Sequence, residues 1–226
     1  MGRLTLPKQR AQETRERIIH AAELVFARHG YGESTVQDIA DEAAISMGAL
    51  YHHFASKEEL FRAILEEHVR RDVMEYEPRP ASSSREAIEY FVAYQIDHLR
   101  QHPELRGLQM ELWAQAMRED WAREACANSF RTFRELISSL IGIAQEASVA
   151  RRDLDIEASA TLIEAIFLGM AIQWAVAPDE GDLESIARTW SDMLERFIQT
   201  DDRGDVEALE TGVTQLFEEL REGDES

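Results

Sequence analysis

Apolar residues recur every three to four positions along most of this 226-residue chain, and no stretch alternates strictly between apolar and polar residues. The first spacing is typical of amphipathic helices, whereas alternation would indicate strands. The pattern therefore predicts an all-α protein. The longer helices are expected at residues 12–29, 57–76, 85–101, 104–118, 119–148, 155–177, 182–199 and 205–221, after a loose basic arm at residues 1–10.

Two further, short helices are predicted within residues 35–54. Thr35 is a suitable N-cap for the first helix, and an acidic residue three positions later forms a variant of the capping box. A tight turn follows, and Ser46 can cap the second helix. Leu50 and Phe54, four residues apart, are expected to point inward. Two short helices with a tight turn between them, followed at once by a third helix, indicate a helix-turn-helix DNA-binding element.

Residues 14–61 resemble the N-terminal domain of the TetR family of one-component transcriptional regulators. The residues that carry this resemblance are Arg15, Ile18, Ala21, Ala22, Phe26, Gly30, Tyr31, Thr35, Ile39, Ala40, Ala43, Ser46, Leu50, Tyr51, Phe54, Lys57, Glu58 and Leu60. The main departure is Ala44, because the family usually places Gly in this turn. If the position requires a positive φ, Ala costs roughly 1 kcal/mol there.

The resemblance implies a homodimer that places one recognition helix per subunit in successive major grooves of a palindromic double-stranded DNA operator. It implies that four residues contact phosphate or the DNA backbone: Thr35, Tyr51, His53 and Lys57. At the helix capped by Ser46, it implies that Met47, Gly48, Ala49 and His52 face base edges. This set lacks the Arg or Gln that makes bidentate base contacts, so we expect modest base readout together with readout of DNA shape. The alternative is that Tyr51 and His53 only pack the domain and that Met47 contacts nothing.

A segment rich in Pro and Ser, residues 78–84, is the clearest linker in the chain. The predicted organisation is a helix-turn-helix domain at residues 1–56, a connecting helix at 57–76 and a helical effector-binding and dimerisation domain at 85–226. In the resemblance, a small-molecule effector enters the second domain and moves the connecting helix.

Aromatic, Met and polar residues at helical spacing are the candidate effector contacts in the second domain, and they favour a hydrophobic or amphipathic molecule. They are Phe91, Tyr94, Gln95, His98, Met110, Trp113, Phe130, Phe133, Phe167 and Met170. The alternative for each is an ordinary place in the core. Glu111 and Glu164 lie within apolar helices and could attract a cationic ligand, although surface positions are expected for both in so acidic a chain.

The last two helices of the standard fold are expected to form the dimer interface. The candidate interface residues are Ile166, Gly169, Gln173, Trp190, Leu194 and Phe197. The alternative for Trp190 and Phe197 is the internal core. The amphipathic segment 205–221 is unusual for the resemblance, and we expect it to dock on its own domain or on the dimer partner. A regulatory contact and a disordered acidic tail are the other readings.

The net charge of -20 comes entirely from one part of the chain. Residues 1–57 carry seven acidic residues and seven Lys or Arg, whereas residues 58–226 carry 37 acidic residues and 17 Arg. The helix-turn-helix half is therefore the half that does not repel DNA. Only two residues are Lys, and this acidic, Lys-poor composition favours a salt-adapted cytoplasm over a merely GC-rich genome.

Cofactors, enzyme activity and a membrane are not expected. No nucleophile elbow, phosphate loop, HExxH or CxxC motif is present, and the set Asp97, His98 and His102 fits a helix boundary better than a metal site. The single Cys126 suits a reducing interior. No unbroken apolar run of 18 residues and no signal peptide are found, so a cytoplasmic protein is predicted.

The leading functional prediction is thus a ligand-responsive transcriptional repressor, and the alternative is a DNA-binding activator or architectural regulator without a small effector. The sequence leaves the effector, the operator, the regulated genes and the sign of regulation open.

Overall fold

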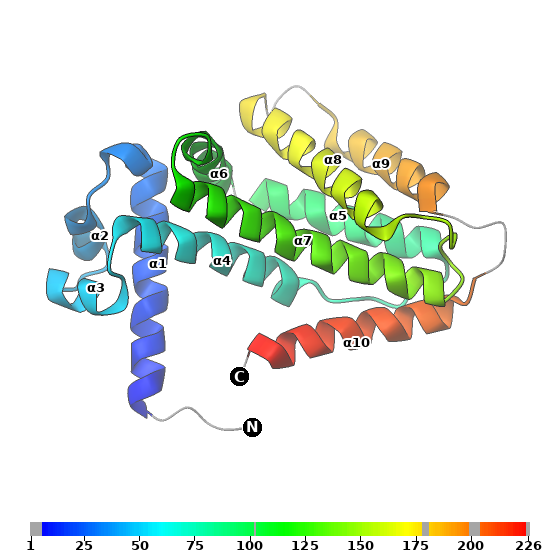
Figure 1. The fold of residues 1–226 in the computed structure, drawn as a ribbon, viewed down its shortest axis with the longest axis horizontal. Coiled ribbons are helices and arrows are strands. Elements are labelled where there is room, and N and C mark those ends of the chain that lie inside the picture. Colours follow the sequence, from blue (N-terminus) through cyan, green and yellow to red (C-terminus); the bar gives the residue numbers. More distant parts are fainter. Residues whose placement is uncertain (1–5, 102, 178–180, 199–203, 225–226) are drawn as a thin grey trace. The chain divides into compact units, whose positions relative to one another are not determined.

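The computed structural model describes residues 6–101, 103–177, 181–198 and 204–224. These residues form ten α-helices and no strand, which confirms the all-α prediction (Figure 1). The helices are α1 (Leu6–Glu33), α2 (Val36–Glu42), α3 (Met47–His53), α4 (Lys57–Glu75), α5 (Ser84–Gln101), α6 (Pro103–Ala116), α7 (Asp120–Glu146), α8 (Ile156–Val176), α9 (Leu183–Ile198) and α10 (Val206–Asp224).

Helix α1 begins earlier than the sequence indicated. The prediction of a loose arm is wrong from Leu6 onward, and residues 1–5 lie outside the described part of the chain. Pro7 sits in the first turn, where its missing N–H breaks no helical hydrogen bond. The predicted helix end at residue 29 agrees with the break at Gly30, which has φ 75° and interrupts the helical geometry.

The chain divides into two compact units that do not follow the predicted linear domains. One unit comprises residues 1–68 and 104–129, and the other comprises residues 69–103 and 130–226. Helix α6 and the first turns of α7 thus pack with the helix-turn-helix segment, whereas the sequence assigned them to a continuous second domain at 85–226. Residues 77–83 are non-helical, as expected of the linker.

A cluster of four aromatic rings explains why residues 104–129 belong to the first unit. The Phe61 ring lies 5.5 Å from Phe26, 4.9 Å from Tyr31 and 6.0 Å from Trp121, measured between ring centroids. Phe61 and Phe26 are fully buried, and Ile18 and Ala22 of α1 are buried with them. Burial of large rings in edge and tilted contacts is among the strongest contributions that a small core receives.

Glu111 on α6 makes a second link within this unit. Its carboxylate accepts hydrogen bonds from the backbone N–H groups of Tyr31, at 2.7 Å, and Gly32, at 3.1 Å. These N–H groups follow the break in α1 and have no helical partner. Glu111 is therefore half-buried and structural in this unit, not the solvated surface carboxylate that the sequence favoured.

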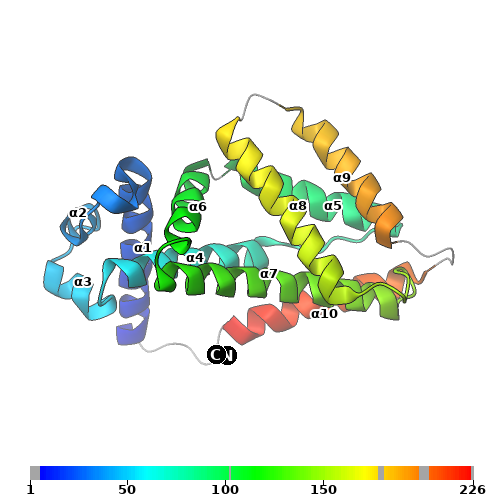
Figure 2. The ribbon, with the colours of Figure 1, turned by 45° about the horizontal axis from the view of Figure 1, so that its top comes forward.

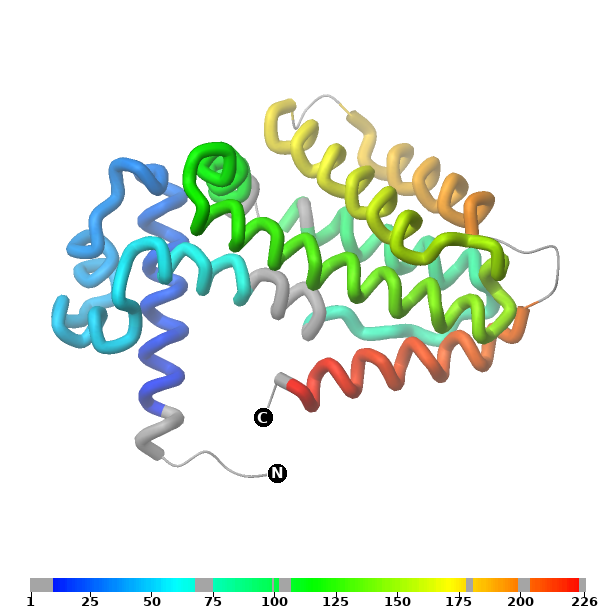
Figure 3. Tube along the Cα trace, viewed as in Figure 1, coloured from blue at the N-terminus to red at the C-terminus, as the bar shows by residue number. Residues whose placement is uncertain are grey.

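The second unit has its core among four helices. Buried residues from α5, α7, α8 and α9 form one cluster: Val92, Ile96, Ile137, Ile141, Ala160, Ile163, Trp190 and Leu194. Helix α5 packs along α9, and this pairing is fixed on the surface by Arg85, which contacts Asp192 at 2.6 Å and Glu195 at 2.7 Å. Figure 3 follows the chain through these helices to α10.

Helix α10 packs on this second unit and runs beside the C-terminal half of α7 in both views (Figures 1 and 2). Phe217 is 1% exposed, and Leu209 joins a small cluster with residues that include Ala144 and Leu154. Docking on its own domain, one of the two expected positions for this amphipathic helix, is therefore confirmed.

Candidate DNA-binding surface and ligand cavity

The ends of α2 and α3 are fixed by the side chains predicted to cap them. The N–H of Asp38 donates to Thr35 Oγ1 at 3.1 Å, and the N–H of Thr35 donates back to the Asp38 carboxylate at 2.9 Å. This is a reciprocal capping box. At α3, the N–H of Ala49 donates to Ser46 Oγ at 3.2 Å. The sequence thus sets where both short helices begin.

The turn between α2 and α3 has a backbone geometry that is unfavourable for Ala44. Ala44 has φ 53°, in the left-handed region. Its N–H donates to the carbonyl of Asp41 at 3.1 Å, and the N–H of Ile45 donates to the carbonyl of Ala40 at 3.0 Å. Two such bonds around a left-handed residue form a Schellman motif, in which Gly is preferred. The turn therefore has the shape of a Gly turn and carries an Ala.

We expect Ala44→Gly to stabilise the protein by about 1 kcal/mol, because Gly adopts this φ without the Cβ clash. The neighbouring Ala43, which has φ -73°, is the matched control, and Ala43→Gly should destabilise the protein. Chemical denaturation of both variants measures the difference. Equal effects of the two substitutions would contradict the strained turn.

The inner face of α3 is locked and its outer face is presented to solvent. Leu50 and Phe54 are buried, as predicted, whereas the Tyr51 side chain is 50% exposed and His52 is exposed. Of the other candidate contacts on or beside this helix, Thr35, Ser46 and Gly48 are exposed, and Met47, Ala49 and His53 are half-buried.

His53 combines partial burial with positive neighbours. Desolvation, followed by the charges of His52 and Arg15, lowers the pKa of His53. Its imidazole is therefore neutral over a wider pH range than usual, so it presents one N–H donor to a phosphate without a positive charge.

The Lys57 side chain binds two backbone carbonyls of its own unit. Its ammonium donates to the carbonyls of Tyr31, at 2.6 Å, and Ser34, at 2.9 Å, and lies 4.3 Å from the centroid of the Tyr31 ring. These bonds hold the segment between α1 and α2 against the start of α4. A phosphate contact by Lys57 remains a prediction, and replacing Lys57 would disturb this segment as well as any DNA contact.

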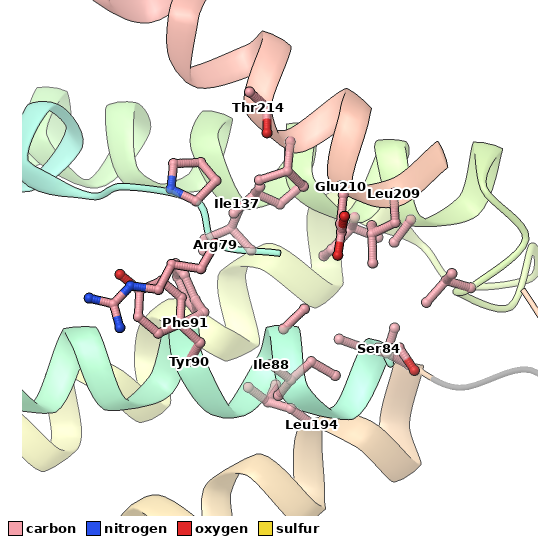
Figure 4. A pocket seen from close by; sticks show the side chains of 18 of the residues that line it. Arg79, Ser84, Ile88, Tyr90, Phe91, Ile137, Leu194, Leu209, Glu210 and Thr214 are labelled. Atoms are coloured by element: carbon pink, nitrogen blue, oxygen red, sulfur yellow. The ribbon is translucent and has the colours of Figure 1, made fainter. Parts of the chain in front are cut away.

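A cavity of about 210 Å³ lies within the second unit, beneath α10 (Figure 4). Its walls come from α5, α7, α8, α9 and α10, and from the non-helical segments after α4 and α7. Most of its lining is apolar, and the lining residues used below are Tyr76, Arg79, Tyr90, Phe91, Glu210 and Val213. Phe91 is the only one of the ten predicted effector contacts among the lining residues of this cavity.

Helices α8 and α9 expose an unusual number of large apolar side chains. On α8 these are Leu162, Ile166, Ile172 and Val176, and on α9 they are Ile186, Met193 and Phe197. Leu162, Ile166, Gly169, Gln173 and Val176 recur at helical spacing, and the added Cβ of a residue at Gly169 would meet nothing within 4 Å. We call this surface the α8–α9 apolar face. Apolar patches of this kind mark interaction surfaces.

Two protein-family models match this chain. Residues 18–64 match the model described as "Bacterial regulatory proteins, tetR family", and residues 84–199 match that described as "BetI-type transcriptional repressor, C-terminal". The chain belongs to the TetR family. Its members are DNA-binding transcriptional regulators, and the capped α2–α3 pair lies inside the first matched segment.

Individual relatives agree with this assignment. The transcriptional regulator UidR of Escherichia coli strain K12 is 30% identical over 166 residues, which cover 71% of this chain and 81% of that protein. A protein of the same strain described as "Probable acrEF/envCD operon repressor" is 27% identical over 207 residues, or 86% of this chain and 91% of that protein. The structure of Salmonella enterica GusR matches with a TM-score of 0.69 and 28% identity, covering 86% of this chain and all of that chain.

The structure separates the predicted effector contacts of this TetR-family chain. Met110 and Trp113 belong to the first unit, and the other eight belong to the second. In the second unit, Phe133 stacks on Phe167 with centroids 5.7 Å apart, and Phe167 stacks on Trp190 at 6.3 Å. Tyr94 contacts Tyr76, Gln95 is buried, and Met170 lines a separate surface hollow with Ile96 and Gln173. Phe130 and His98 are half-buried.

Two predicted dimer contacts are corrected. Trp190 is 3% exposed and Leu194 is 6% exposed, and both belong to the core of the second unit. They lie on the face of α9 that packs inward, so they are not available to a second subunit. Ile166, Gly169, Gln173 and Phe197 lie on described helices and remain candidates, because Ile166, Gln173 and Phe197 are exposed and the space beside Gly169 is open.

Glu164 is also corrected, from a surface carboxylate to a buried one. Its side chain is 5% exposed and pairs with Arg134 at 3.2 Å. Desolvation raises the pKa of Glu164, and Arg134 opposes this shift. The sequence predicts a surface position for Glu164 because it does not show which face of α8 packs against α7.

Helix α8 is, by length and composition, apolar enough to cross a membrane, and it is the only such helix in the described part of the chain. The sequence-based prediction of no membrane helix rests on a stricter criterion, an unbroken run of 18 apolar residues, which α8 does not contain. Ala160, Ile163 and Ala171 of α8 are buried in the protein, and its exposed side belongs to the α8–α9 apolar face. Core and interface helices satisfy the same test of composition.

Proposed function

We propose that this chain is a homodimeric, sequence-specific DNA-binding repressor that a hydrophobic or amphipathic small molecule releases from its operator. The observation that carries the proposal is the construction of α3. Its inner face is fixed by buried Leu50 and Phe54, and its outer face leaves Tyr51 and His52 exposed. A rigid short helix with an exposed polar and aromatic face is suited to the major groove.

The α8–α9 apolar face supports the homodimer. An apolar surface formed by two helices of one chain can meet the same surface of a second copy across a two-fold axis, so that four helices form the interface. Dimerisation matters for DNA recognition because a palindromic operator presents two half-sites about one helical turn apart. A dimer fixes the spacing of the two α3 helices, and a monomer does not.

The cavity beneath α10 supports response to a ligand. A ligand releases a repressor only if it binds the DNA-free arrangement more tightly than the DNA-bound one. The cavity offers an apolar lining of the kind that small hydrophobic molecules occupy. As a DNA-binding regulator, the protein would act in the cytoplasm on chromosomal DNA.

Selection of bound duplexes from a random pool, with the full chain as bait, tests the proposal. We expect an enriched palindrome with two half-sites, and we expect the complex to contain two protein chains for each duplex. A screen for compounds that release this duplex then tests the ligand response. Failure to enrich any sequence, even at low ionic strength, would contradict the proposed repressor.

We expect Tyr51→Phe to weaken operator binding about tenfold or more, because a hydrogen bond from a hydroxyl to a charged phosphate contributes roughly 1.5–3 kcal/mol. The substitution keeps the exposed ring and removes only the hydroxyl. Fluorescence anisotropy with the selected duplex gives the affinity. Met117→Ala, at an exposed position outside the helix-turn-helix, is the control and should bind normally. Normal affinity of Tyr51→Phe would remove Tyr51 from the phosphate contacts.

A further inference from the structure

Helix α10 supplies one side of the cavity, although neither matched family segment includes it. The two segments end at residues 64 and 199, and α10 begins at Val206. Four residues of α10 line the cavity: Leu209, Glu210, Val213 and Thr214. The α10 side of the cavity therefore lies outside the matched segments, whereas most of the other lining residues lie within residues 84–199.

The attachment of α10 is close and polar as well as apolar. A Cβ added at Gly212 would lie 2.6 Å from Ile143 Cγ2, so the helix backbone approaches α7 as closely as only Gly allows. Near its end, the Arg221 guanidinium donates to the carbonyl of Tyr76 at 2.8 Å, and the Phe217 and Tyr76 rings lie 4.7 Å apart. These contacts hold α10 closely against the second unit, where it covers the cavity as a lid. Helix α10 is therefore not a loosely attached tail.

Two charged residues stand among the apolar lining. The Glu210 carboxylate accepts a hydrogen bond from the N–H of Ala81 through Oε1, which leaves Oε2 for a ligand. In Figure 4, Glu210 extends from α10 toward the middle of the lining residues, whereas the Arg79 guanidinium lies at the edge of the group. Arg79 stacks over the Tyr90 ring, with its Cζ 4.7 Å from the ring centroid.

The aromatic side of the cavity suits a cation. Tyr76, Tyr90 and Phe91 line it, and the faces of such rings attract ammonium and guanidinium groups. Arg79 already stacks over the Tyr90 ring in this way, which shows that this aromatic group holds a cation. The charge of residues 58–226, with 37 acidic residues against 17 Arg, also favours a cation over an anion in this part of the chain.

We propose that the cavity under α10 binds a compact hydrophobic cation, an aromatic or alkyl ammonium, with Glu210 as its counter-charge and the tyrosine and phenylalanine rings around its apolar part. The volume of about 210 Å³ suits a molecule of this size, since a cavity of about 150 Å³ accommodates benzene. The further role of this molecule as the effector rests on the proposed function.

The connection to α4 gives the site a route to the DNA-binding element. Tyr76 directly follows Glu75, the last residue of α4, and α4 begins at Lys57 just after the recognition helix α3. Tyr76 lines the cavity and is also held by α10 through Phe217 and Arg221. A ligand that contacts Tyr76 therefore acts on the residue that directly follows the connecting helix.

Calorimetry on the full-length protein with three probes of nearly equal size tests the binding site. The probes are benzyltrimethylammonium, its uncharged isostere neopentylbenzene, and the anion phenylacetate. We expect the cation to bind at least tenfold more tightly than either of the others. Equal binding of all three, tighter binding of the anion, or no binding of the cation would each overturn the proposal.

Glu210→Gln tests the counter-charge while keeping a carbonyl oxygen that can accept the Ala81 N–H. Its affinity for benzyltrimethylammonium should fall at least tenfold and its affinity for neopentylbenzene should stay the same. Glu207→Gln, which removes an exposed carboxylate from the first turn of the same helix, is the matched control and should bind the cation normally. Equal losses in the two variants would show that only general acidity attracts the cation, which overturns the assigned site.

Gly212→Ala tests whether α10 forms the lid. The added methyl meets Ile143, so the helix cannot dock closely, and we expect cation affinity to fall at least tenfold while the helical content is retained. Gly223→Ala lies on the same helix, where a Cβ meets nothing within 4 Å, and should bind normally. Unchanged affinity of Gly212→Ala would overturn the assignment of α10 as lid.

The inference and the proposed function fail separately in these experiments. If the cation does not bind but another compound releases the operator, the site under α10 is wrong and the ligand-responsive repressor stands. If the cation binds as described but no duplex is selected, the binding site stands and the repressor is wrong.

Discussion

Ile166→Glu is expected to convert the proposed homodimer to monomers and to weaken operator binding at least a hundredfold. Ile166 is 39% exposed on α8, next to open space at Gly169, and it belongs to the α8–α9 apolar face. In a two-fold interface the new carboxylate would be buried twice, near its own copy. An unpaired buried charge costs several kcal/mol, which is enough to dissociate most dimers. The loss of fixed spacing between two α3 helices would then reduce DNA affinity.

Sedimentation velocity gives the oligomeric state, and anisotropy with the selected duplex gives the affinity. Because Ile166 is partly exposed in the single chain, the variant should keep its helical content and thermal unfolding temperature apart from the contribution of dimerisation. Ala93→Glu places the same charge at an exposed position of α5 and should remain dimeric. A dimeric Ile166→Glu variant would place the interface elsewhere.

Phe61→Ala is expected to lower the free energy of unfolding by about 3–5 kcal/mol, which is the usual cost of removing a fully buried aromatic ring. Phe61 is 0% exposed and touches the rings of Phe26, Tyr31 and Trp121. The ring therefore joins α1, α4 and α7 within the first unit. A loss of this size is a large fraction of the stability of an ordinary domain, so DNA binding should fall with it.

Urea denaturation followed by circular dichroism measures this change, with Phe61→Leu as the control. Leu refills most of the space, so its cost should be clearly smaller than that of Ala. A cost below about 1 kcal/mol for Phe61→Ala would mean that the four rings do not form the core of this unit.

Local sequence determined the helix-turn-helix in detail. Thr35 and Ser46 start α2 and α3 because their hydroxyls accept N–H groups only three residues away. Leu50 and Phe54 are buried because a spacing of four residues puts them on one face. Even the unusual feature, Ala44 in a turn that prefers Gly, was visible as a departure from the family pattern. All of these interactions involve partners close in sequence.

The cavity under α10 was found only in the structure. Its walls combine residues at 76–91, 137–149, 163, 194–198 and 209–214, which are far apart in the chain. The apolar stripe on α10 predicts that this helix packs against another surface, but its periodicity does not identify that surface. The sequence predicts ligand contacts from residue type and helical spacing. The structure stacks Phe133 and Phe167 on each other against the core of the second unit, and neither lines this cavity.

Trp190 and Glu164 show why residue type is a poor guide to exposure on a helix that is apolar on several faces. The sequence predicts that α8 and α9 form a dimer interface, but packing buries the side chains of Trp190 and Glu164 within their own unit. The rotation of a helix about its axis is set by its neighbours, so side chains a few residues apart can end in a core or on a surface.

The sequence by itself determined the family, the all-α class, the recognition helix and most helix boundaries within a few residues, with the start of α1 as the exception. Caps, turns and amphipathic spacing act over three or four residues, which is why local sequence determines them. Only the tertiary structure decided that residues 104–129 pack with the helix-turn-helix, which faces of α8 and α9 are buried, and that α10 closes a cavity. These outcomes depend on contacts such as Trp121 with Tyr31 and Gly212 with Ile143, whose partners lie tens of residues apart.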